Sequence, residues 1–201
     1  MNKTKEKILL TALRLFATRG YEATSVSDIA KDLGVTKGAL YKHYKSKRDV
    51  FDKIIAHMAQ RDVEEAKRFD LPTGTLEEMK DAYRAATINR IVEFGRAMFR
   101  YWTQDEFAAS FRKMLMLEQF HNSEMGALYQ QYLVSGPIGY TTDLFVSLGV
   151  SEPERKAIEF YAPMFLLYSV YDGAEDHDQA LAMLDECMAN ARQKLSEETL
   201  K

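Results

Sequence analysis

A short segment of the sequence, from Thr36 to His43, carries the side chains with the clearest chemistry. They are small, hydroxylated or cationic: Thr36, Lys37, Gly38, Ala39, Tyr41, Lys42 and His43. Ammonium and hydroxyl groups donate hydrogen bonds to phosphate oxygens and to the acceptors on base edges. Gly38 costs about 1 kcal/mol in a helix relative to alanine, a cost that is understandable where the backbone approaches a nucleic-acid surface. The segment therefore indicates nucleic-acid binding.

The charges divide the chain into a basic and an acidic part. Residues 1–60 contain 12 Lys and Arg against 6 Asp and Glu, whereas residues 61–201 contain 15 against 24. A basic module on an acidic body is the electrostatic pattern of a small nucleic-acid-binding protein. A basic solvated face is the alternative interpretation of the same charges.

The elements that must position these side chains are helices. Apolar residues at helical spacing predict helices over residues 4–19, 26–33, 37–43 and 46–68, with Gly20 and Gly34 ending the first two. The second and third form a helix-turn-helix in which two apolar sets face each other: Val26, Ile29, Ala30 and Leu33 against Val35, Leu40 and Tyr44. Because the third helix is too short to be stable alone, its packing on the second must hold it rigid.

The remaining sequence also predicts helices, so the fold class is all-α with about nine helices in total. The 201 residues include only 4 Pro and 10 Gly, and no window alternates apolar with polar residues. After a break at 71–74, Thr75 and Glu78 form a capping box that starts a helix of about 26 residues. Further helices are expected over 105–120, 124–148, 152–172 and 176–196, the second kinked or broken by Gly136, Pro137 and Gly139 and the third bent by Pro163.

Other classes of protein find little support in the sequence. The lone cysteine, Cys187, forms neither an intramolecular disulfide nor a cysteine-built metal site, which suits a reducing compartment. No apolar stretch reaches the ~18 residues of a membrane span. Signatures of hydrolases, zinc proteases and nucleotide-binding enzymes are missing. The Glu118 and His121 pair and the acidic cluster at 175–178 are interpreted as structural. We expect a cytoplasmic protein that is no enzyme, with no catalytic residue, metal, cofactor or membrane partner.

Residues 4–55 resemble the DNA-binding domain of the TetR family of bacterial transcriptional regulators. The resemblance rests on F-A-T-R-G-Y-E-A-T-S-V followed by D-I-A-K-D-L-G-V-T-K-G-A-L-Y-K-H-Y-K-S-K-R-D-V-F. It implies a DNA-binding domain over 1–46, a connecting helix over 47–70, and a helical effector-binding and dimerisation domain over 71–201. Ala39 departs from the hydroxyl residue often found there in the family, which removes one phosphate hydrogen bond.

The resemblance also implies a role for each residue of the short helix and its neighbours. Lys37, Gly38, Ala39, Tyr41, Lys42 and His43 would lie in the major groove, with Lys37 and His43 as candidates for base edges. Thr24, Thr36, Tyr41 and Lys47 would contact phosphates. A buried structural histidine is the alternative for His43. Lys45, Lys47 and Arg48 stand at a helix start that favours acids, a conflict that phosphate would resolve.

Family members pair through their last two helices, and two apolar stripes here fit such a dimer. The candidate interface residues are Ile158, Ala162, Phe165, Leu181, Leu184, Met188, Ala191 and Leu195. Packing into their own subunit's core is the alternative. A two-fold dimer places its recognition helices about 34–36 Å apart and predicts a near-palindromic operator.

The region between Phe94 and Phe145 is rich in aromatic residues and methionine, which line pockets for apolar ligands. Candidate effector contacts are Phe94, Met98, Arg100, Tyr101, Trp102, Phe120, Tyr129 and Tyr140, with ordinary core packing as the alternative for each. Arg96 and Arg100 would hold a ligand carboxylate or pair with Glu118. The expected function is a ligand-responsive repressor with a small, largely apolar effector. An architectural DNA-binding protein of the same fold is the alternative.

Overall fold

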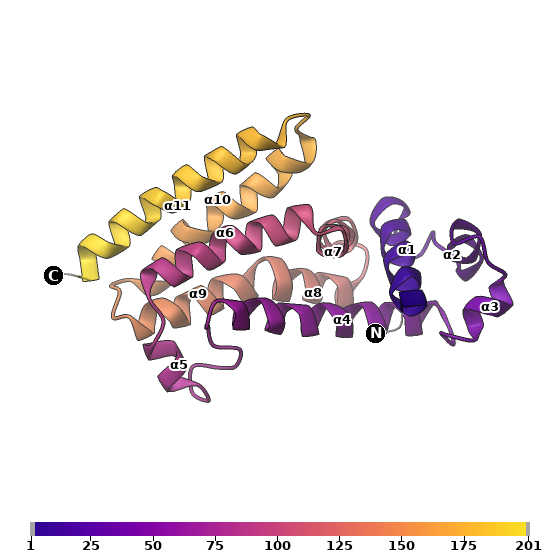
Figure 1. The fold of residues 1–201 in the computed structure, drawn as a ribbon, viewed down its shortest axis with the longest axis horizontal. Helices are drawn as coiled ribbons and strands as arrows, with labels where there is room; N and C mark the ends of the chain where they lie inside the picture. Colours follow the sequence, from indigo (N-terminus) through magenta and orange to yellow (C-terminus); the bar gives the residue numbers. More distant parts are fainter. Residues whose placement is uncertain (1–2, 200–201) are drawn as a thin grey trace. The chain divides into compact units, whose positions relative to one another are not determined.

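The computed structural model describes residues 3–199, and every regular element in that range is an α-helix (Figure 1). The all-α prediction is confirmed, although the described residues form eleven helices rather than about nine. They divide into two compact units, one of residues 3–61 with 105–129 and the other of residues 62–104 with 130–199. Each unit is described by itself below.

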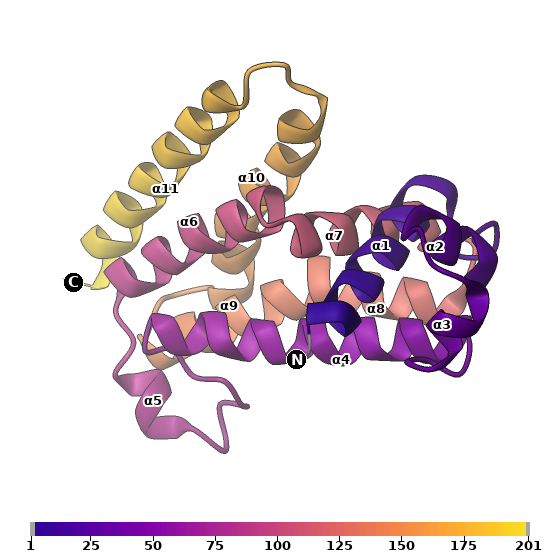
Figure 2. The same cartoon turned by 45° about the vertical axis from the view of Figure 1, so that its right-hand side comes forward.

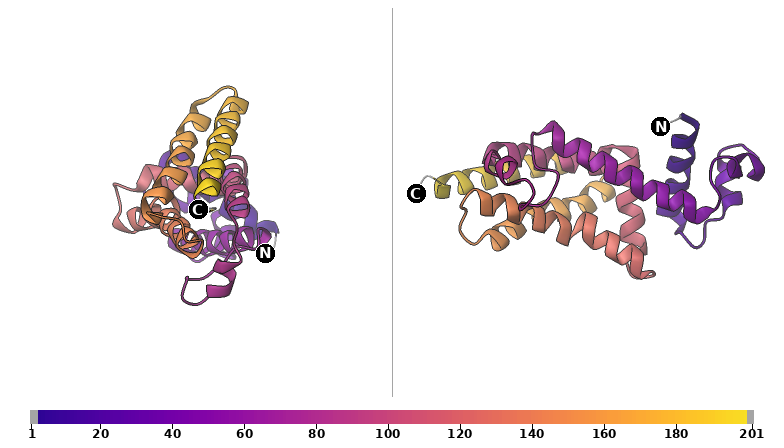
Figure 3. Two further views of the ribbon diagram at one scale, coloured as in Figure 1. Left: turned by 90° about the vertical axis from the view of Figure 1, so that its left-hand side faces the viewer. Right: turned by 90° about the horizontal axis from the view of Figure 1, so that it is seen from below.

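The first unit contains the predicted helix-turn-helix. Its helices are α1 (Lys3–Arg19), α2 (Val26–Asp32), α3 (Lys37–Tyr41), the larger part of α4 (Lys47–Arg68), α7 (Glu106–Glu118) and the first half of α8 (Ser123–Leu133). The predicted bounds hold to within two residues, and α3 ends at Tyr41 instead of residue 43. Helix α1 packs against α2 and α7, and it crosses the start of α4 steeply (Figure 3).

Apolar stripes from these helices form the core that supports α3. Ile8, Leu9, Ala12, Leu13 and Phe16 of α1 are buried, as are Val26, Ile29, Ala30, Leu40 and Tyr44. Tyr44 also donates a hydrogen bond of 3.2 Å from its hydroxyl to the carbonyl of Lys5, and burial raises the pKa of Tyr44 to about 12. Val35 was expected in this core but is 44% exposed, because it lies in the turn where α2 has ended and α3 has not begun.

The second unit contains the remaining helices. They are α5 (Lys80–Arg84), α6 (Ile88–Gln104), α9 (Ser135–Ser147), α10 (Pro153–Gly173) and α11 (His177–Thr199), together with the ends of α4 and α8. Helix α11 packs against both α6 and α10, and Figure 2 shows α10 and α11 as a helical pair.

One predicted helix of this unit is replaced by two shorter ones. The capping box at Thr75 forms, with Glu78 accepting from its amide and hydroxyl, but a single helix of about 26 residues is wrong. A second helix starts after Thr87, whose hydroxyl accepts a hydrogen bond from the Arg90 amide and so acts as a cap.

The expected break before Pro137 is confirmed at Val134, because proline lacks an amide and crowds the carbonyl four residues earlier. Pro163 lies inside an uninterrupted α10.

Candidate DNA-binding interface

The turn and caps around α2 follow from local sequence. Ser25 is the N-cap of α2: its hydroxyl accepts from the Asp28 amide at 3.1 Å, and the Asp28 carboxylate accepts from the Ser25 amide at 2.8 Å. The hydrogen bonds from Ser25 lower the pKa of Asp28. Gly34 then takes a φ of +68°, a left-handed conformation that glycine adopts without steric cost. These features set the direction in which the chain enters α3.

Helix α3 presents its outer face to solvent. Thr36 caps it by accepting a hydrogen bond of 3.2 Å from the Ala39 amide, which leaves the hydroxyl proton of Thr36 available to a phosphate oxygen. Tyr41 is 44% exposed, and Lys37 lies over its ring at 5.8 Å. A Cβ added to Gly38 would meet no atom closer than 4.0 Å, so nothing inside the protein requires glycine there. The open space lies on the face predicted to approach DNA.

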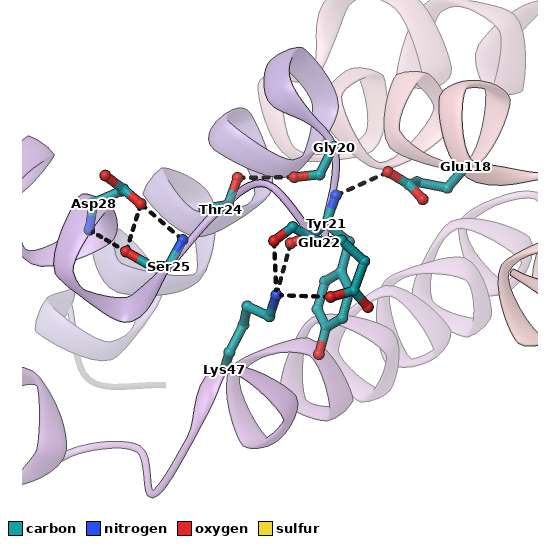
Figure 4. A network of polar contacts seen from close by, with 8 residues as sticks. All are labelled: Gly20, Tyr21, Glu22, Thr24, Ser25, Asp28, Lys47 and Glu118. Carbon is teal, nitrogen blue, oxygen red and sulfur yellow. Dashed lines mark hydrogen bonds and ion pairs between the residues drawn. The ribbon is translucent and has the colours of Figure 1, made fainter. Parts of the chain in front are cut away.

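The loop between α1 and α2, residues 20–24, is held by one polar contact within the loop and by two from other helices (Figure 4). The Thr24 hydroxyl donates to the Gly20 carbonyl at 2.9 Å. Lys47 of α4 donates from Nζ to the Tyr21 carbonyl at 2.9 Å, and Glu118 of α7 accepts from the Tyr21 amide at 2.8 Å. We call these three residues the loop brace.

The loop brace corrects two predicted phosphate contacts. Thr24 is only 1% exposed and its hydroxyl is used inside the loop, so a phosphate cannot reach it. The ammonium of Lys47 also lies 4.2 Å from the Tyr21 ring centroid and 3.5 Å from a carboxylate oxygen of Glu22. Lys47 therefore positions the loop instead of extending toward DNA.

Arg48 is also satisfied inside the protein. Its guanidinium donates to both carboxylate oxygens of Glu124 at 2.6 Å and to Asp52 at 2.7 Å. The expected conflict at the start of α4 is thus largely resolved by carboxylates and not by phosphate. Ser46 and Asp49 form the predicted cap, in which the Asp49 carboxylate accepts from the Lys45 amide at 2.8 Å.

Three cations remain on and beside α3. Among the described residues, Lys37, Lys42 and Lys45 are exposed and make no ion pair with a protein carboxylate. Sequence reasoning had placed Lys45 only in the group at the start of α4. His43 is half-buried and lies beyond the end of α3, in the turn before Tyr44. Lys37, Lys42 and Lys45, with Thr36 and Tyr41, are called the α3 face below.

The second unit contains a cavity of about 320 Å³. Four of the predicted effector contacts line it: Phe94, Met98, Trp102 and Tyr140. Four do not: Phe120 is 88% exposed at the end of α7, Tyr129 is buried in the first unit, Tyr101 is buried against Trp102, and Arg100 pairs elsewhere. The prediction missed wall residues from α10, including Phe160, Tyr161, Met164 and Tyr168, whose helical spacing was the available signal.

Arg96 and Arg100 have a partner that neither sequence hypothesis named. Both guanidinium groups contact Asp185 of α11, at 3.1 Å and 3.3 Å. Glu118 is held in the first unit by the Tyr21 amide, with His121 4.0 Å away. The pairing of these arginines with Glu118 is therefore wrong, and neither arginine lines the cavity.

The residues predicted to form the dimer interface differ in their burial. Leu184, Met188 and Leu195 of α11 are buried in the second unit, so the alternative reading holds for these three, while Leu181 and Ala191 are half-buried. On α10, Ile158, Ala162 and Phe165 face outward. Leu166 and Val170 extend this exposed apolar strip.

Within residues 3–199, no helix is long and apolar enough to cross a membrane, and no three His, Cys, Asp or Glu side chains gather as metal ligands do. The Glu118 carboxylate accepts the hydrogen bond from the Tyr21 amide in the loop brace.

Residues 8–54 match the family described as bacterial regulatory proteins, tetR family. The HTH-type transcriptional regulator AcrR of Shigella flexneri is 30% identical over 122 residues, which are 61% of this chain and 50% of that protein. The HTH-type transcriptional repressor BepR of Brucella suis is 41% identical over 73 residues, 35% of each protein. The matched part of the chain spans at most half the length of these curated relatives.

Solved structures show the likeness of the fold. A transcriptional regulator from Aquifex aeolicus gives a TM-score of 0.66 at 18% identity, over 96% of this chain and 98% of that one. A tetR-family regulatory protein from Rhodococcus gives a TM-score of 0.66 at 16% identity, over 97% and 98% of the two chains.

Proposed function

Because its N-terminal domain belongs to the tetR family of bacterial regulatory proteins, we propose that this chain is a transcriptional repressor that binds DNA as a homodimer. The target is a near-palindromic operator, and a small, largely apolar effector releases the protein from it. The observation that carries the proposal is the α3 face, where Lys37, Lys42 and Lys45 are exposed and unpaired beside a braced loop.

The α3 face supports DNA binding because its groups match the chemistry of a duplex. Lys37 stands at the start of α3, where a lysine reaches guanine O6 or N7 in the major groove. Thr36, Tyr41, Lys42 and Lys45 offer donors for flanking phosphates, which fix the register without reading sequence. Val35, exposed beside them, offers an apolar contact for a thymine methyl group.

The exposed strip on α10 supports the homodimer. Ile158, Phe165, Leu166 and Val170 would be covered by the same strip of a second copy, giving the isologous contact of a two-fold dimer. The dimer would separate two α3 helices by about one turn of DNA, roughly 34–36 Å.

The cavity supports regulation by an effector. Residues of α4 line it, namely Asp62, Val63 and Ala66, and the same helix begins at Lys47 of the loop brace. An effector that moves α4 would change the spacing of the two α3 helices and lower the affinity for the operator by population shift.

Selection of bound fragments from a random pool of duplex DNA tests the proposal. A repressor should enrich one near-palindromic site, and the affinity should fall steeply with salt because phosphate contacts release counterions. Lys37→Ala should relax the preference at one position by ~1–3 kcal/mol. If the affinity hardly depends on salt, DNA is not the partner. In a map of the chromosomal sites that the protein binds, many scattered sites without an adjacent promoter would favour the architectural alternative.

A further inference from the structure

Of the 22 described residues that line the cavity in the second unit, seven are aromatic. Phe94 and Trp102 come from α6, Tyr132 from α8, Tyr140 from α9, and further rings come from α10. The Phe94 and Tyr140 rings meet edge to face at 6.2 Å, and the Trp102 and Tyr132 rings do so at 6.4 Å. Edge-to-face and stacked contacts of this kind stabilise an aromatic guest beyond the area it buries.

The distance between the two ring pairs suggests the length of the ligand. Phe94 and Trp102 are eight residues apart on α6, which separates them by about 12 Å along the helix axis. A molecule with two or three rings spans this distance and contacts both pairs.

The polar groups of the cavity offer little to an anion. Among the described residues, those that line it include no lysine, arginine or histidine, and Asp62 contributes a carboxylate. Burial, with a smaller contribution from the Asp62 carboxylate, raises the pKa of Tyr132 to about 12, so a negative charge on this phenol is disfavoured at this end of the cavity. Arg96 and Arg100 are engaged by Asp185.

Two tyrosine hydroxyls in the wall already donate to the backbone. Tyr140 donates to the Pro72 carbonyl at 2.9 Å, and Tyr161 donates to the Leu133 carbonyl at 2.8 Å. A ligand carboxylate would therefore have to break these bonds to gain their protons. These two hydroxyl groups connect the wall to the backbone. Thr73, Gln131 and Thr141 add uncharged polar groups to the wall, and its aromatic rings offer surfaces for stacking.

We propose that this cavity binds an aromatic small molecule of two or three rings that carries no acidic group. The inference rests on the proposed function, since it gives the chemical class of the effector. It excludes fatty acids and other carboxylates as the effector of this chain.

Two probes with the same ring skeleton test whether the cavity accepts a ligand with a negative charge. N-phenyl-1-naphthylamine is uncharged, and 8-anilino-1-naphthalenesulfonate carries a sulfonate on the same rings. Trp102 is the only tryptophan in the chain, so its emission reports from the cavity wall. We expect saturable quenching of Trp102 by the uncharged probe, with energy transfer to it, and an affinity at least tenfold higher than for the sulfonate.

A pair of variants tests the position of the bound probe. Phe94→Leu removes one ring from the wall but keeps an apolar side chain, and it should weaken the uncharged probe at least fivefold. Phe120→Leu removes a ring from an exposed position just after α7, outside the cavity and outside the α10 strip, and should leave the affinity within twofold. Circular dichroism checks that both variants fold; if Phe94→Leu does not, the two probes on the unaltered chain decide the question.

The outcomes separate this inference from the proposed function. Equal or tighter binding of the sulfonate, displacement of the uncharged probe by dodecanoate at similar concentrations, or no saturable quenching would overturn the inference. The same preparation is tested for binding to the selected DNA without any probe. If DNA is bound and the aromatic probe is not, only the inference fails; if DNA is not bound, the proposed function fails whatever the probes do.

Discussion

The backbone amide of Tyr21 donates a hydrogen bond of 2.8 Å to the carboxylate of Glu118, 97 residues further along the chain. Glu118 is buried at the end of α7. One of its carboxylate oxygens lies so near Gly20 that a Cβ on this glycine would be only 2.7 Å from it. The α1–α2 loop is thereby attached to a helix that no local sequence pattern connects with it.

We predict that Glu118→Ala destabilises the protein by about 1–3 kcal/mol, because the Tyr21 amide loses its acceptor in a partly buried site. Glu118→Gln keeps an acceptor oxygen and should cost less. Urea denaturation measures both. Equal losses for the two variants would show that the charge, and not the acceptor, matters.

Replacement of Gly20 by alanine should be more costly than the same change at Gly34. Both residues have positive φ, +89° and +68°, so each alanine carries about 1–2 kcal/mol of left-handed strain. At Gly20 the new Cβ would also lie 2.7 Å from the Glu118 carboxylate and displace it, whereas nothing lies within 4 Å at Gly34. Chemical denaturation of the two variants should therefore differ by about one hydrogen bond, roughly 1 kcal/mol.

Lys42→Met and Lys47→Met should have opposite signatures. Lys42 is exposed on the α3 face, so its loss should lower the slope of log Kd against log salt by about one and leave stability unchanged. Lys47 braces the Tyr21 carbonyl, so its loss should lower the free energy of unfolding and leave the salt slope in place. Fluorescence anisotropy with the selected DNA at several salt concentrations makes the comparison. If Lys47→Met also lowers the slope of log Kd against log salt, Lys47 contacts DNA phosphates after all.

The ion pair between Arg48 and Glu124 should make the first unit sensitive to acid. Hydrogen bonds from Arg48 lower the pKa of Glu124 in the folded protein. The stabilisation is therefore fully present above the ordinary glutamate pKa near 4.5, and it is lost as the pH falls through the lowered folded value. Thermal melting from pH 7 to pH 3 should show a smaller loss for Glu124→Gln than for the unaltered chain. Identical profiles would contradict the expected role of this pair.

Leu166→Glu should convert a dimer into a monomer, because it places a charge in the exposed apolar strip of α10. Val146→Glu is the matched control, since Val146 is an exposed apolar residue of α9 outside the strip. Analytical ultracentrifugation distinguishes the two states. A Leu166→Glu variant that remains dimeric would place the interface elsewhere.

The sequence by itself determined the features that depend on residues a few positions apart. The apolar periodicity gave α1 to α4 nearly their observed bounds, and Ser25 with Asp28 and Thr75 with Glu78 formed the expected caps. Gly20 and Gly34 took the left-handed conformation expected of them. Local caps and glycine conformations depend on the chain within about one helical turn, so a reading of neighbouring residues suffices.

The tertiary structure decided which partner each polar or apolar group meets. A basic residue near a predicted DNA surface looks the same in sequence whether it is exposed, as Lys42 is, or folded back onto a loop, as Lys47 is. An apolar stripe shows only that a helix buries one face, so it could not tell that Leu184 packs within its own unit while Phe165 faces outward. Such contacts join residues far apart in the chain, and only the packing of the helices brings them within reach.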